Sequence, residues 1–107
     1  MVIWLINHMT MKEIDFRAAV LLESLGEPIR YLIIRHLQTG AKAVGELARL
    51  TRRHQTTVCQ HLAILRHLNV VRYHNRGPCT FYELKLTGVT QLLDSARELS
   101  RKTTSIP

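Results

Sequence analysis

Acidic residues are absent between Glu46 and Glu83, although the sequence contains eight of them in all. This acid-free stretch holds six of the fifteen lysines and arginines, together with four of the six histidines. The other nine basic residues nearly balance the eight acidic ones, so almost all of the net charge of +7 belongs to this stretch. Most short charge runs are solvated surface, but a run this long and of one sign favours a polyanionic partner. Nucleic acid and an anionic membrane surface are the two candidates.

Cysteine and long apolar runs are also scarce. The two cysteines, Cys59 and Cys79, are too few for the disulfide framework of a small secreted domain, so we expect a reducing, cytoplasmic environment. The apolar opening over residues 1–6 is far too short to span a membrane and has neither a basic leader nor a small-residue cleavage site. We therefore expect no membrane partner, and an N-terminal arm over residues 1–10 that either frays or packs on a partner.

The groupings of side chains that support catalysis are missing as well. The sequence has no nucleophile with a nearby base and orienting acid, no glycine-rich phosphate loop and no paired carboxylates, so we predict that the protein is not an enzyme. A chain of 107 residues with 46% hydrophobic and 21% charged residues is typical of one small globular domain. We place that domain at residues 11–102 and expect a loose tail over 103–107.

Apolar residues recur at helical spacing in five segments. Gly26 closes the first helix, proline opens the second, and Thr87 resembles the N-cap of the last. The predicted helices cover about residues 12–25, 28–39, 44–50, 55–68 and 88–101.

The helix over residues 55–68 has two unlike faces at 100° per residue. Its apolar arc holds Val58, Leu62, Ile64, Leu65 and Leu68, and its opposite arc holds Thr56, Cys59, Gln60, Ala63 and His67. Two short helices joined by a tight turn, the second with a small and hydrogen-bonding exposed face, are typical of a helix-turn-helix.

Two segments rich in β-branched and aromatic residues, 70–74 and 80–84, predict a β-hairpin. Between them, Asn75 and Gly77 are suited to a positive φ at the tip. The predicted fold class is therefore mainly α with a small β-hairpin, an α+β arrangement.

Helix, helix, short helix, exposed helix, basic hairpin and helix is the order of a winged helix-turn-helix domain. Over an ungapped stretch from about Leu25 to Leu86, the chain resembles the ArsR/SmtB family of repressors. The motifs that carry the resemblance are Leu25–Arg30, Val44–Ala48, Thr57–Leu62, Val70–Val71 and Gly77–Tyr82. The resemblance implies a homodimer that binds a palindromic operator on double-stranded DNA and is released by a metal or another chemical signal.

The exposed helix is the predicted reading element, because an α-helix fits the major groove while arginines fix its position on phosphates. Gln60 is the best base-edge candidate, since its amide can pair with adenine through two hydrogen bonds. His61 borders the apolar arc, so a packed histidine and a base contact are equal alternatives. Arg52 and Arg53 are predicted to anchor a phosphate, and the hairpin is predicted to be a wing over residues 70–86. The predicted DNA-binding residues are Arg52, Arg53, His54, Gln55, Thr56, Thr57, Gln60, His61, Arg72, His74, Asn75 and Arg76.

The first and last helices carry apolar stripes that close either the core of one subunit or a dimer seam. We favour a dimer seam, because two-fold symmetry doubles the base readout of a single module. The predicted interface residues are Phe16, Leu21, Leu22, Leu92, Leu93 and Leu99.

The metal sites that the family resemblance implies are missing from the sequence. Ala43 and Gly45 occupy the positions of one cysteine pair, and Ile64 and Leu68 occupy those of another. Only Asp94 remains of the carboxylate and histidine set on the last helix. We predict no cofactor and no metal ligand of the family type, and leave a non-standard metal site open.

Cys59 and Cys79 are the candidate redox or effector residues. Cys59 stands where the family usually has serine, on the DNA-facing arc, and the spacing of the two cysteines matches no short metal motif. Oxidation of a thiol on this arc would disturb DNA contact.

The predicted function is a sequence-specific transcriptional regulator, a homodimeric repressor released by a chemical signal, with an oxidant and a metal both open. Two alternatives remain: a non-specific architectural DNA-binding protein, and a winged-helix module for protein interaction.

Overall fold

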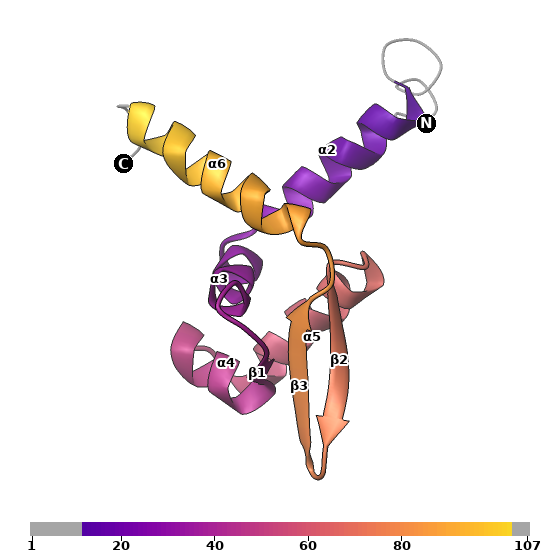
Figure 1. The fold of residues 1–107 in the computed structure, drawn as a ribbon, viewed down its shortest axis with the longest axis vertical. Coiled ribbons are helices and arrows are strands. Elements are labelled where there is room, and N and C mark those ends of the chain that lie inside the picture. The colour runs from indigo at the N-terminus through magenta and orange to yellow at the C-terminus, as the bar shows by residue number, and fades with distance from the viewer. Residues whose placement is uncertain (1–11, 104–107) are drawn as a thin grey trace.

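A computed structural model of the protein describes residues 12–103. The predicted N-terminal arm over residues 1–10 and the tail beyond Thr103 lie outside the described residues. The helices are α2 (Glu13–Leu25), α3 (Pro28–Leu37), α4 (Val44–Thr51), α5 (Gln55–His67) and α6 (Gly88–Lys102), and the strands are β1 (Lys42–Ala43), β2 (Val71–Arg76) and β3 (Cys79–Leu84) (Figure 1). The predicted order of helices and hairpin, and the mainly α fold class, are confirmed.

The core lies where α3, α4 and α5 meet the base of the hairpin. Its fully buried side chains include Ile33, Ile34, Leu47, Leu62 and Leu65. The predicted apolar arc of α5 is correct at three central positions, Val58, Leu62 and Leu65, and wrong at Ile64, which is 42% exposed. Ile64 lies at the edge of the arc, so its side chain projects outside the core when Val58, Leu62 and Leu65 are buried.

The turn between α4 and α5 is short and tightly bonded. The Arg53 N–H donates to the Ala48 carbonyl at 3.1 Å and the Arg52 N–H to the Arg49 carbonyl at 3.3 Å, which is the Schellman arrangement. Arg52 occupies the left-handed position of that motif with a φ of 56°, where glycine is the usual residue. The bend directs α5 away from α4 and leaves both arginines exposed at its start.

The sheet has three strands in the order β1-β3-β2, all antiparallel. Strand β1 was not predicted from the sequence, and its two residues pair with Tyr82 and Phe81 of β3. The hairpin is also tighter than predicted, since Asn75 pairs with Thr80 inside the ladder. Gly77 alone takes a positive φ, of 59°, ahead of Pro78, in the manner of a type II′ turn. The expectation of a positive φ at Asn75 is therefore wrong.

Helices α2 and α6 leave the core in different directions at the end opposite the hairpin tip (Figure 1). Leu25 is the buried residue of α2, and Val89 and Leu93 are those of α6. Leu93 is only 3% exposed and belongs to the core of the subunit, which corrects its assignment to a dimer seam. Thr87 precedes α6 as predicted but makes no side-chain cap bond. Within residues 12–103, no helix is long and apolar enough to cross a membrane.

Candidate nucleic-acid interface

The face of α5 opposite its buried residues carries most of the predicted base contacts. Thr56, Cys59 and Gln60 are exposed and Thr57 is half-buried. Because Val58, Leu62 and Leu65 hold the other side of the helix in the core, these polar groups are presented outward from a fixed backbone. Donors and acceptors near the start of such a helix can meet base edges in a major groove.

The entrance to α5 has the features of a phosphate anchor. Arg52 and Arg53 are exposed, and within residues 12–103 neither forms an ion pair. His54 is the N-cap, yet its side chain makes no cap bond to the amides of the first turn, where exposed Gln55 stands. Guanidinium groups beside uncapped N–H groups at a helix start suit an oxyanion.

Of the two wing arginines that were predicted to bind DNA, one already has an acidic partner. Arg72 Nε lies 2.8 Å from Glu83 Oε2 on the neighbouring strand, so this arginine is already paired. The Arg76 guanidinium lies 5.2 Å from the ring centre of Phe81 and has no acidic partner among the described residues. Arg76, at the hairpin tip, is the better placed of the two for a phosphate.

Two other predicted DNA contacts of the wing, His74 and Asn75, interact with neighbouring residues of the wing itself. His74 is half-buried and stacks on Phe81 with ring centres 5.8 Å apart, and its Nε2 is buried with no hydrogen-bond partner among the described residues. Asn75 is exposed and its Oδ1 accepts a 2.9 Å hydrogen bond from the Thr80 hydroxyl. Asn75 therefore stays near the tip with limited freedom, and His74 serves the packing of the wing.

Arg66 joins this surface, although no role was predicted for it from the sequence. Its guanidinium lies 5.1 Å from the ring centre of Tyr73, whose ring is 5.7 Å from that of Tyr82. Burial raises the pKa of the Tyr82 hydroxyl, Arg66 opposes the rise, and Cys59 and Tyr73 add to it. The only sequence signal for this contact is the membership of Arg66 in the acid-free stretch.

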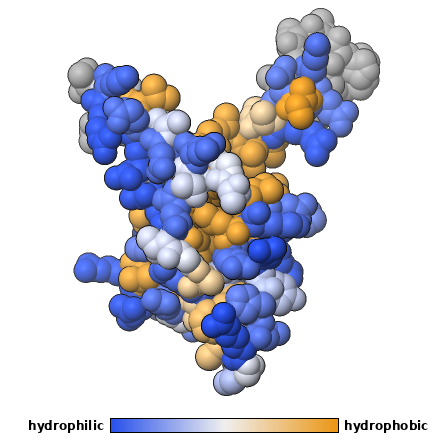
Figure 2. All heavy atoms as spheres, in the orientation of Figure 1, coloured by the Kyte–Doolittle hydropathy of each residue, from blue (hydrophilic) through white to orange (hydrophobic). Residues whose placement is uncertain are grey.

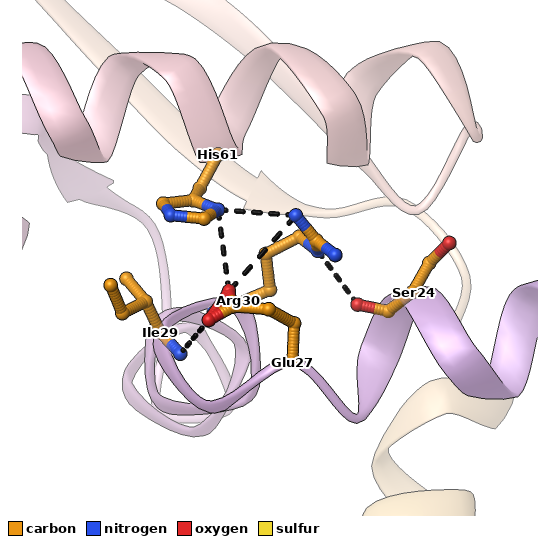
Figure 3. Close-up of polar contacts among 5 residues, drawn as sticks. All are labelled: Ser24, Glu27, Ile29, Arg30 and His61. Carbon is orange, nitrogen blue, oxygen red and sulfur yellow. Dashed lines mark hydrogen bonds and ion pairs between the residues drawn. The ribbon is translucent and has the colours of Figure 1, made fainter.

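His61 turns away from the DNA-facing side of α5. Its Nδ1 lies 3.2 Å from Arg30 Nη1 and 3.4 Å from Glu27 Oε2, and the side chain is 17% exposed (Figure 3). The prediction of a base contact by His61 is therefore corrected to its alternative, a packed histidine. Figure 3 shows the ring directed at the start of α3.

Cys59 and Cys79 line the same cavity. It has a volume of about 420 Å³ and lies between α5, the start of α4 and the wing, with Gln55, Pro78 and Tyr82 among its walls. Both cysteines are free and exposed. Within residues 12–103, no three histidine, cysteine or acidic side chains gather as a metal site would require.

A helix-turn-helix with an exposed polar second helix, followed by a hairpin, defines a winged helix-turn-helix domain. In agreement, the fold superposes with a TM-score of 0.73 on the homodimeric winged helix-turn-helix DNA-binding domain of a Mycobacterium bovis protein. That match has 22% identity and covers 81% of each chain. The structure of HlyU from Vibrio cholerae matches with a TM-score of 0.75 and 29% identity, over 83% of this chain and 97% of that one.

Sequence comparison gives the family. The model of the bacterial regulatory protein, arsR family, matches residues 27–73. The biofilm growth-associated repressor of Xylella fastidiosa is 31% identical over 93 residues, which cover 84% of this chain and 82% of that relative. The chain belongs to the ArsR family of DNA-binding transcriptional regulators.

Proposed function

We propose that the protein is a homodimeric transcriptional repressor that binds a palindromic operator and is released by a chemical signal. The observation that carries the proposal is the exposed polar face of α5, which follows directly on Arg52 and Arg53 and is flanked by Arg66 and Arg76. On this proposal the protein regulates rather than catalyses. A biofilm growth-associated repressor among the relatives is consistent with repression.

Each part of this surface has its own task in the proposal. Gln60, with Thr56 and Thr57, reads base edges, since these groups project from the start of a helix held firmly by the core. Arg52 and Arg53 fix the position of the protein on phosphates. Arg76 contacts the backbone beside the operator, because it lies at the end of the wing without an acidic partner among the described residues.

Dimerisation is supported by the two projecting helices. Ile14 and Leu22 of α2 and Leu99 of α6 are 67%, 54% and 63% exposed. Figure 2 shows apolar atoms on both projecting helices and in the space where they diverge. Helices of 13 and 15 residues gain little stability in isolation, so apolar stripes of this kind favour packing against a second subunit. Phe16, Leu21 and Leu92 are half-buried, and Leu21 and Leu92 pack partly against the core of the subunit.

The shared cavity supports Cys59 and Cys79 as the site of the chemical signal. Cys59 belongs to the recognition helix and Cys79 to the wing, so a bond between them would couple two DNA-binding parts. With hydrogen peroxide as oxidant, the two thiols lose two protons and two electrons to form a disulfide, and the hydrogen peroxide is reduced to two molecules of water. A soft metal ion held by both thiolates is the other form of the proposal.

The cysteine proposal is tested with peroxide and then with thiophilic metal ions, added to the protein bound to operator. We expect wild type to release DNA with one of these reagents, and Cys59→Ser and Cys79→Ser to hold it. Release that is unchanged in Cys59→Ser excludes the thiol signal.

The repressor proposal is tested by selecting bound sequences from random duplex DNA. We expect enrichment of two inverted half-sites about 10 base pairs apart, because each recognition helix of a symmetric dimer enters a successive major groove. Binding without enrichment identifies an architectural DNA-binding protein. DNA affinity that survives charge reversal of Arg52 and Arg53 points to a module for protein interaction.

A further inference from the structure

Glu27, Arg30 and His61 form a polar cluster between the start of α3 and the middle of α5 (Figure 3). Glu27 caps α3, accepting hydrogen bonds from the Ile29 N–H at 2.9 Å and the Arg30 N–H at 3.3 Å. Arg30 reaches back to α2, where its Nε donates to the Ser24 carbonyl at 2.7 Å. One guanidinium therefore joins the last turn of α2 to the recognition helix.

The three side chains are largely removed from water, being 28%, 15% and 17% exposed in the order Glu27, Arg30, His61. Burial acts to raise the pKa of the Glu27 carboxyl. The two backbone N–H groups, the charge of His61 in its protonated form and the charge of Arg30 outweigh burial and lower that pKa below its ordinary value. A partly buried polar group that loses its hydrogen-bond partner is left with an uncompensated desolvation penalty, so each of the three contacts stabilises the geometry of the cluster.

Hydrogen-bond roles at His61 follow from its partners. A guanidinium only donates, so a neutral ring accepts from Arg30 at Nδ1 and carries its own proton on Nε2, whereas a protonated ring presents an Nδ1–H to the Glu27 carboxylate 3.4 Å away. The contact with Arg30 fixes the tautomer of the neutral ring and holds α5 through a directional bond. The apolar contacts of Val58, Leu62 and Leu65 bury the helix but are non-directional.

We propose that Glu27, Arg30 and His61 are positioning residues that set the orientation of α5 and tie it to the end of α2. His61 is adjacent to Gln60 and one turn beyond Thr57, so a small rotation of the helix about its axis displaces both predicted base contacts. Base readout tolerates little displacement. Operator affinity then depends on side chains that do not face DNA.

The connection to Ser24 extends the effect to the dimer seam. Helix α2 projects from the core with its exposed apolar residues, and Arg30 binds the carbonyl near its C-terminal end. A shift of α2 at the seam is thereby transmitted through one guanidinium to the recognition helix. This inference rests on the proposed function, in which α2 meets a second subunit and α5 reads DNA.

Two amide replacements of different length separate positioning from DNA contact at His61. In His61→Asn the amide oxygen takes the place of Nδ1 and preserves the acceptor for Arg30, whereas in His61→Gln the amide extends toward the place of Nε2. We expect Asn to keep operator affinity within about threefold of wild type, and Gln and His61→Leu to lose about tenfold or more. Rescue by Gln and not by Asn means that His61 touches DNA, and overturns the inference. All affinities are compared at equal concentrations of folded protein, so a purely structural role predicts lower unfolding midpoints with unchanged affinities.

A second measurement does not require DNA. Long-range proton–nitrogen NMR on the wild-type protein at an alkaline pH, where a histidine side chain is neutral, reports which ring nitrogen of His61 carries the proton, and we expect the Nε2–H tautomer. Arg30→Lys keeps the charge but loses the planar fork, and should change the His61 nitrogen shifts and lower operator affinity together. A wild-type ring protonated on Nδ1, or shifts unchanged in Arg30→Lys, overturns the inference. If the tautomer is as expected but wild type does not discriminate among DNA sequences, the proposed function fails and the contact itself stands.

Discussion

Replacement of Arg52 by glycine should raise the stability of the fold while it weakens DNA binding. Arg52 has a φ of 56° at the left-handed position of the turn between α4 and α5, and its side chain is exposed at the entrance to the recognition helix. The same residue is therefore strained by the backbone and placed for a phosphate. Residues with opposite effects on folding and binding mark a site where function outweighs stability.

The expected change in stability follows from two backbone terms, and the change in DNA affinity follows from the lost phosphate contacts. A non-glycine residue in the left-handed region costs about 1–2 kcal/mol, and glycine costs about 0.5–1 kcal/mol in backbone entropy, so Arg52→Gly should gain about 0.5–1 kcal/mol. For a domain of this size, that gain corresponds to a rise in Tm of about 3–6 °C. On DNA, a dimer loses two phosphate contacts, which lowers the salt slope by about two and the affinity by roughly thirtyfold near 0.15 M salt.

Two glycine variants serve as controls. Asn69 is the other described non-glycine residue with a positive φ, of 62°, and lies at the far end of α5, so Asn69→Gly should stabilise the fold and leave DNA affinity unchanged. Arg53→Gly should weaken DNA binding and lower Tm, because Arg53 has no positive φ to relieve. Thermal unfolding at a fixed protein concentration and salt titrations of DNA affinity provide both readouts. A lower Tm for Arg52→Gly refutes the strain argument, and an unchanged salt slope refutes the phosphate contact.

Three further predictions concern other parts of the molecule. Glu27→Gln should lower the free energy of unfolding by about 1 kcal/mol at neutral pH. Because the pKa of Glu27 in the folded state lies below its ordinary value of 4.5, the stability advantage of wild type should be full above pH 4.5 and vanish as the pH falls through the lowered pKa. Urea unfolding across pH is the check. Glu83→Gln should release Arg72 and raise DNA affinity a few-fold at low salt, with less than about 1 kcal/mol change in stability, and weaker binding would contradict the pairing seen in the wing. Leu22→Glu combined with Leu99→Glu should yield folded monomers in sedimentation, because both residues are exposed apolar groups on the projecting helices. Leu93→Ala, by contrast, should lower the free energy of unfolding by about 2–5 kcal/mol, because Leu93 is a core residue.

Helix positions and the hairpin could be predicted because they depend on local signals. Periodic apolar residues, Gly26 after α2 and a proline at the start of α3 reproduce the helix bounds to within about two residues. Strand β1 could not be predicted, since its two residues are held only by pairing with β3, far along the chain. The positive φ of Arg52 was equally hidden, because arginine is no signal for a left-handed turn.

The roles of side chains between the buried and exposed faces of α5 were the hardest to predict from the sequence. A helical wheel places His61 between two faces, and its choice of the inner one depends on Glu27 and Arg30, more than thirty residues earlier. The same limit applies to Arg72, whose partner Glu83 lies across the ladder, and to the cavity that Cys59 and Cys79 share. In each case the deciding contact is tertiary, and no local pattern encodes it.

The most direct test of the account is the specificity ratio, the affinity for a selected operator divided by that for random duplex DNA, measured over a range of salt concentrations. For wild type we predict a ratio of about a thousand or more. Gln60→Ala should lower the ratio, because it removes a base contact, whereas Arg53→Ala should weaken both affinities and leave the ratio nearly unchanged. A wild-type ratio near one, or an equal loss of both affinities in Gln60→Ala, would contradict the assignment of sequence reading to the exposed face of α5.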